Sequence, residues 1–152
     1  MTAKVLLVED DRALREALAD TLMIGGHEFR AVECAEDAVA ALMARIEGPL
    51  RIGAPLGIGK PHRLLNALYA QVGEDPSRPL SLYTALSLDP PRGRSLLEKR
   101  FLDPFVERLY GNDFPRLAYV TAQKQDALPT HIEVVRVWHA SRGLEALMED
   151  PG

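Results

Sequence analysis

Apolar and polar positions alternate in blocks along the chain, and each block predicts one strand or helix. Residues 4–8, "KVLLV", form the continuous apolar run that is typical of a strand buried on both faces of a parallel sheet. In the segment that follows, Leu14, Leu18 and Leu22 recur at helical spacing, and Gly25 and Gly26 end the pattern. The same order then repeats, which predicts further strands at 28–34, 50–54 and 79–87 and helices at 35–48 and 61–73.

The last third of the chain is less regular. Ser95 and Glu98 form an S-x-x-E capping box, which predicts a helix beginning there. Asp103 and Pro104 inside that segment predict a break or kink, because proline cannot donate a backbone hydrogen bond. We expect late strands at 116–120 ("RLAYV") and 131–138 ("HIEVVRVW"), and a short helix from Ser141 in a terminal segment, 139–152.

Strands that alternate with helices predict an α/β fold with a mainly parallel, doubly wound, three-layer sheet and flanking helices, Rossmann-like or flavodoxin-like. A strand–helix–strand–helix segment of 47 residues buries too little surface to be stable alone. We therefore expect the first two strands to lie beside residues 50–54 in one continuous sheet. An exposed edge of such a sheet could pair two copies of the chain into a homo-oligomer.

Composition narrows the classes of partner. The 152 residues carry a net charge of −4 and no basic run, which argues against a nucleic-acid partner. No stretch approaches the roughly 20 apolar residues of a membrane span, so we expect no membrane partner. The single cysteine, Cys34, favours a reducing cytoplasm and is expected to be a buried thiol. The histidines have no partners at metal-ligand spacing; they are His27, His62, His131 and His139.

The first segment, 1–47, ends its first strand in an acidic corner. From "KVLLVEDD" to "ECAEDAVAAL", residues 4–42 resemble the opening of a response-regulator receiver domain. This resemblance implies that Glu9 and Asp10 bind Mg²⁺, and Asp11 is better explained as a helix cap. The resemblance also places a phosphoacceptor aspartate at the end of the third strand. No Asp or Glu occurs from Gly48 to Gly73, so we expect either a weak Mg²⁺ site or a merely solvated acidic corner.

The second segment, 48–138, resembles another family. "LRIGAPLGIGKP", "RFLDPFVERLYG" and "LPTHIEV" are similar to the N-terminal domain of the acetyl-CoA hydrolase/transferase family. The resemblance implies that Gly53, Gly57, Gly59 and Lys60 lie near an acyl-CoA site, with coenzyme A as cofactor. By spacing alone the same loop could be a plain strand-to-helix turn. The family's catalytic glutamate lies in its second half, so no catalytic residue is assigned.

Three functions stay open. The favoured one is an incomplete CoA-transferase-like domain that contributes to acyl-CoA binding, pairs with a catalytic C-terminal half and has no turnover alone. The alternative is a degenerate receiver-like signalling or interaction module without a phosphoacceptor. Thr84 falls near the family's switch hydroxyl, a match we attribute to coincidence because the acceptor is missing. The third is a recombined chain with no activity.

Overall fold

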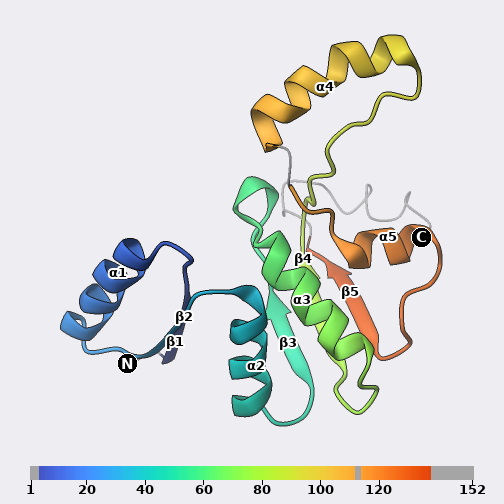
Figure 1. Ribbon diagram of the computed structural model, residues 1–152. Coiled ribbons are helices and arrows are strands. Elements are labelled where there is room, and N and C mark those ends of the chain that lie inside the picture. The colour runs from blue at the N-terminus through green and yellow to red at the C-terminus, as the bar shows by residue number, and fades with distance from the viewer. Residues whose placement is uncertain (1–3, 112–113, 138–152) are drawn as a thin grey trace. The chain divides into compact units, whose positions relative to one another are not determined.

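The computed structural model describes residues 4–111 and 114–137 as an α/β structure in which parallel strands alternate with helices (Figure 1). This confirms the predicted fold class. The elements are β1 (Lys4–Val8), α1 (Arg12–Ile24), β2 (Glu28–Val32), α2 (Ala35–Arg45), β3 (Leu50–Gly53), the 3₁₀ turn η1 (Gly57–Gly59), α3 (His62–Gly73), β4 (Leu80–Thr84), α4 (Leu96–Tyr110), α5 (Ala118–Lys124) and β5 (Ile132–Arg136).

The described strands form a two-stranded sheet and a three-stranded sheet, both parallel. Strand β1 pairs with β2, from Lys4 opposite Glu28 to Val8 opposite Val32. Strand β4 lies between β3 and β5, and both of its pairings are parallel. The continuous sheet expected from the sequence, with the first two strands beside β3, stays a prediction. Each strand pairs with the preceding or the following strand of the chain.

The chain divides into two compact units, and each unit is built from separate stretches of the sequence. The first unit contains residues 4–48 and 62–78, and the second contains 49–61, 79–111 and 114–137. In the first unit α3 packs against α2, and the buried side chains come from those two helices. They include Ala38, Val39, Leu65, Leu68 and Val72. The core of the first unit therefore lies between α2 and α3.

Helix α1 forms as the sequence predicts. The Asp11 carboxylate caps it by accepting a hydrogen bond from the Leu14 N–H at 2.9 Å, and Gly25 ends it. None of the residues of α1 is buried, and Leu14 keeps 48% of its surface exposed. The apolar stripe thus predicts the helix correctly, but its side chains are not buried.

Two predictions for the second unit need correction. The break expected at Pro104 is absent, since α4 runs from Leu96 to Tyr110 with Pro104 inside it, whereas a kink at Pro104 stays a prediction. The Ser95–Glu98 capping box forms the start of α4 as predicted. Residues 118–124 form helix α5 where a strand was expected at 116–120. A short apolar run does not distinguish a strand from one buried helical turn. Leu117 and Tyr119 are both buried, at the start of α5.

The core of the second unit follows its sheet. Leu50, Leu80, Leu82 and Ile132 are buried along β3, β4 and β5, and β5 confirms the predicted last strand.

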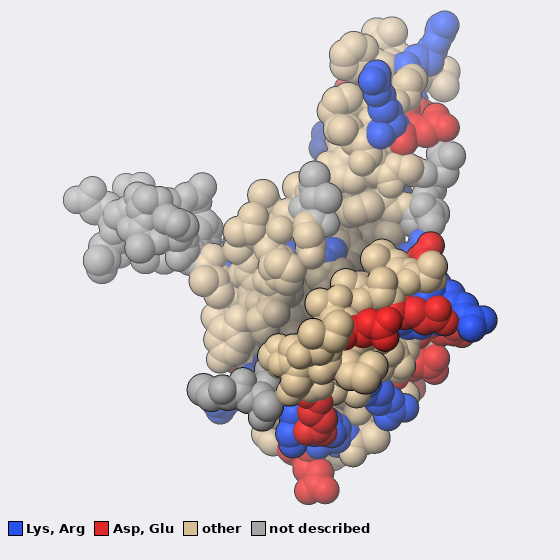
Figure 2. All heavy atoms as spheres, turned by 90° about the vertical axis from the view of Figure 1, so that its left-hand side faces the viewer, with Lys and Arg blue, Asp and Glu red and all other residues tan. Residues whose placement is uncertain are grey.

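Among the described helices none is both long and apolar enough to cross a membrane. The face drawn in Figure 2 shows acidic and basic side chains interspersed. Trp138, His139 and the helix expected from Ser141 lie outside the described residues.

Candidate functional site

A buried lysine organises the carboxyl end of β4. The Lys60 ammonium donates hydrogen bonds to Thr84 Oγ1 at 2.6 Å, to Ser87 Oγ at 2.8 Å and to the Ala85 carbonyl oxygen at 3.2 Å. Lys60 and Thr84 each keep only 4% of their surface exposed. Burial lowers the pKa of the Lys60 ammonium, because the charged form loses hydration. An ammonium has three hydrogens, and here each has an acceptor inside the protein.

The network continues to α5. Ser87 Oγ lies 3.1 Å from the Tyr119 hydroxyl, and either oxygen can donate. Ser87 Oγ accepts a hydrogen bond from Lys60. If Ser87 donates its own proton to the Tyr119 hydroxyl oxygen, the phenol proton of Tyr119 is left for a further acceptor. If Tyr119 donates instead, the proton of Ser87 is left, with only the Ala85 carbonyl oxygen at 3.4 Å. In either arrangement the pair has one hydroxyl proton more than its mutual hydrogen bond uses.

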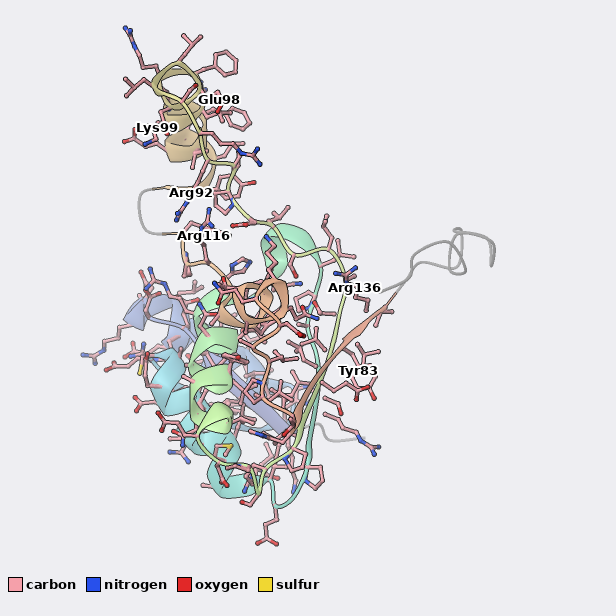
Figure 3. The ribbon with its side chains drawn as sticks, turned by 90° about the vertical axis from the view of Figure 1, so that its right-hand side faces the viewer. Tyr83, Arg92, Glu98, Lys99, Arg116 and Arg136 are labelled. Atoms are coloured by element: carbon pink, nitrogen blue, oxygen red, sulfur yellow. The ribbon has the colours of Figure 1, made fainter. Side chains whose placement is uncertain are left out.

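These hydroxyls line a cavity of about 520 Å³ at the carboxyl end of β4 and β5. Ligands of parallel α/β sheets bind at this end of the strands. Arg136, the last residue of β5, also lines this cavity, and Figure 3 labels its place at the end of the strand. Asp89 and Lys124 also line the cavity, and Asp89 lies 3.4 Å from both Arg116 and Lys124. The apolar part of the lining comes from Leu86, Val120, Val134 and Val137.

The glycine-rich loop is tied to the strand exit. The Ala54 N–H donates to the Tyr83 carbonyl oxygen at 2.8 Å, and the Gly57 N–H donates to the Leu86 carbonyl oxygen at 3.0 Å. Gly57 has a φ of +65°, which strains any residue with a Cβ. A Cβ at Gly53 or Gly59 would meet nothing within 4 Å, and neither has a positive φ. Of the three glycines assigned to an acyl-CoA site, only Gly57 is needed by the backbone conformation.

The described contacts of Lys60 lie inside the protein. Its ammonium hydrogens are directed to Thr84, Ser87 and Ala85. The described geometry accounts for Lys60 as a support of the β4 exit. An acyl-CoA site at Gly53, Gly57, Gly59 and Lys60 stays a prediction.

The acidic corner is folded as a helix start. The Asp11 N–H donates to Glu9 Oε1 and to Asp10 Oδ1, both at 3.1 Å. Arg15 Nη1 donates to the Glu9 carbonyl oxygen at 2.6 Å, and Arg15 Nη2 lies 3.6 Å from Glu33. Among the described residues no group of three potential metal ligands is assembled. Mg²⁺ takes few protein carboxylates, so binding by the Glu9 and Asp10 pair stays a prediction.

Cys34 has a structural role at the start of α2. Its sulfur accepts a hydrogen bond from the Asp37 N–H at 3.4 Å in the N-cap position. The thiol belongs to a half-buried residue, where a fully buried one was expected. Because caps must reach the first turn of a helix, they lie at its edge and keep contact with solvent.

Sequence reasoning missed several residues of the cavity, chiefly Ser87, Tyr119 and Arg136. Tyr119 was missed because its segment was assigned to a strand. Ser87 and Arg136 had a usable signal, since Ser87 ends one predicted parallel strand and Arg136 lies near the carboxyl end of another, where ligand sites gather. The inward turn of Lys60 had no such signal, because burial of a lysine depends on tertiary packing.

Comparisons with known proteins match part of the chain. No family model matches the chain. The response regulator protein FleR of Pseudomonas aeruginosa is 74% identical over 42 residues, which are 28% of this chain. The chain spans only 9% of that relative's length. Part of the chain is thus similar to a response regulator, in agreement with the receiver resemblance of residues 4–42, and the match brings no support for the CoA-transferase resemblance.

A solved structure of NtrX from Brucella abortus, in complex with ADP, covers 86% of this chain and 28% of its own at 21% identity, with a TM-score of 0.33. A TM-score of that size does not establish a shared arrangement of the whole chain.

Proposed function

We propose that the chain is a receiver-like signalling or interaction module that works without phosphorylation. One observation carries the proposal: the strand–corner–helix front is formed, while no carboxylate follows β3. Strand β3 ends at Gly53, and no Asp or Glu occurs from Gly48 to Gly73. Phosphoryl transfer to a receiver needs an acceptor carboxylate beside the metal-binding pair. The similarity to FleR supports the receiver origin of the front.

The backbone of the acidic corner supports a role that is structural. Arg15 binds the carbonyl oxygens of both Glu9 and Asp10, which fixes the turn into α1. The two carboxylates are held by the Asp11 N–H. A front built in this way keeps its surface whether or not a metal or a phosphoryl group is present.

The module must be folded in solution, and amide hydrogen exchange of the full chain tests this. We expect the hydrogen-bonded amides of β1 and β2 to exchange more slowly than an unfolded chain of the same sequence. The strand β4 provides the internal reference, because Leu80, Leu82 and Thr84 are buried. Unfolded rates throughout residues 4–45, beside a protected β4, would remove the proposal and favour a recombined chain without function.

A second candidate is small-molecule binding by the β3–β4–β5 unit, favoured by the cavity beside Ser87 and Tyr119. The predicted coenzyme A site belongs to this candidate. A titration to millimolar coenzyme A should shift the amide signals of residues 50–65 if the loop binds it. The absence of any shift there would remove coenzyme A binding at the loop, and shifts confined to the residues of the cavity would mean that coenzyme A binds in the cavity instead.

A further inference from the structure

Helix α4 carries an apolar stripe that the described protein leaves uncovered. Leu97, Phe101, Phe105 and Leu109 recur every four residues and therefore share one side of the helix; we call them the α4 stripe. All four are exposed, with 78% of Leu97 and 81% of Phe101 accessible. None of the residues of α4 is buried. Contiguous exposed apolar surface of this kind is typical of an interaction site.

The charges beside the stripe identify what can cover it. When two copies of α4 are laid antiparallel about position 103, Leu97 lies opposite Leu109 and Phe101 lies opposite Phe105. The same register places Glu98 of one copy opposite Arg108 of the other, an attractive pair that occurs twice. In the capping box Glu98 Oε2 accepts from the N–H groups of Arg94 and Ser95, at 2.6 Å and 3.2 Å. The other carboxylate oxygen, Oε1, can then accept from a guanidinium.

The surface at the first half of α4 has a hollow that can receive an apolar side chain of a second copy. An open hollow of about 710 Å³ is lined by Arg92, Arg94, Leu97, Glu98, Phe101 and Leu102. Figure 3 shows Glu98 and Lys99 on the helix and Arg92 on the segment before it. Phe105, on the second half, lies opposite Phe101 in the antiparallel register, so it can enter the hollow of a second copy. A two-fold axis makes both contacts at once, as an isologous interface requires.

We propose that α4 is a homodimer interface, in which two copies of the chain pair their α4 stripes antiparallel. The interface is limited to one helix of 15 residues from each copy and the segment before it. Stable standard interfaces bury roughly 1,200 to 2,000 Å² in total, and one short helix from each copy is a small surface by that standard. The association is therefore weak and reversible, and it depends on protein concentration. This surface differs from the sheet edge that the sequence suggested.

Sedimentation equilibrium of the full chain over a range of concentrations tests the proposal. We expect a reversible monomer–dimer equilibrium. Arg108→Glu places a second carboxylate opposite Glu98 of the other copy, and the repulsion should weaken the dimer at least about tenfold. Its matched control is Arg100→Glu, which makes the same charge change on the side of α4 away from the stripe and should leave the dissociation constant within about twofold.

The apolar part of the interface has its own pair of variants. Phe105→Gln removes the side chain that enters the hollow and should also weaken the dimer about tenfold or more. Leu96→Gln, at an exposed apolar position of α4 outside the stripe, should not. Because these side chains are exposed in the single copy, none of the variants should change its helical circular dichroism. A chain that stays monomeric at its solubility limit would overturn the proposal, as would equal weakening by the stripe and control variants.

Discussion

The Lys60 ammonium lies 2.6 Å from Thr84 Oγ1. This hydrogen bond joins a loop to the last residue of β4, and both side chains are buried. It joins the glycine-rich loop to the strand exit, where Gly57 also binds the Leu86 carbonyl oxygen. A buried charge of this kind is stable only while its hydrogens have acceptors. The arrangement accounts for the lysine without any ligand.

Replacing Lys60 by methionine should destabilise the second unit by about 1 to 3 kcal/mol, because the Ala85 carbonyl oxygen and the two hydroxyls lose a charged donor. The free energy of opening, measured by hydrogen exchange at the β4 amides, gives the value. Lys99→Met on α4 is the control and should change the free energy by less than about 0.5 kcal/mol, since Lys99 is exposed. An unchanged β4 in Lys60→Met would contradict the role given to the ammonium.

The stability of the unit should also depend on Lys60 at alkaline pH. Burial lowers the pKa of this ammonium in the folded chain from its ordinary value of 10.5. Between the lowered pKa and 10.5 the unfolded chain binds more protons than the folded one, so this group makes the stability rise with pH in that window. The slope of the free energy of unfolding against pH should therefore be more positive in the parent chain than in Lys60→Met. Identical slopes would show that the group does not titrate differently on folding.

In the first unit, the cost of truncating a leucine should depend on which helix carries it. Leu68 on α3 is buried against α2, and Leu68→Ala should cost about 2 to 5 kcal/mol. Leu18 on α1 is exposed, and Leu18→Ala should cost less than about 1 kcal/mol. Exchange at the α3 amides measures the first value and exchange at the β1 amides the second. A large loss in Leu18→Ala would mean that α1 has a core that the described packing lacks.

Metal binding at the acidic corner is tested by Mn²⁺, which broadens the signals of nearby amides. Two carboxylates without a third protein ligand should bind only weakly, with a dissociation constant on the order of millimolar. Broadening of the Asp10 and Asp11 amides should disappear in the Glu9→Gln/Asp10→Asn double variant. Glu36→Gln, on the surface of α2, is the control. Tight binding, or broadening that survives in the double variant, would contradict the assignment.

What the sequence predicted well was local chemistry. Asp11, Gly25 and the Ser95–Glu98 box mark helix ends because capping groups bind backbone only a few residues away. Apolar runs located β1, β3 and β4, because a continuous run of apolar residues is itself a local pattern that is typical of a buried strand. Where one apolar run was short, at residues 116–120, the local pattern was ambiguous, and the segment forms helix α5 with Tyr119 buried.

What the sequence could not predict depends on contacts distant along the chain. The pairing of strands is such a property, because each strand has compatible partners on several others. The inward direction of Lys60 depends on Thr84 and Ser87, more than 20 residues away. The cavity combines β4, α5 and β5, so its lining appears only when all three are placed.

The missing acceptor carboxylate is the central claim, and it is tested most directly by incubating the full chain with acetyl phosphate and Mg²⁺ and measuring its intact mass. An intact response-regulator receiver, treated in parallel, shows that the reagents are active. We expect the parallel sample to gain a phosphoryl group that hydroxylamine removes, and this chain to keep its mass. A hydroxylamine-sensitive phosphoryl adduct on any aspartate or glutamate of this chain would contradict the account.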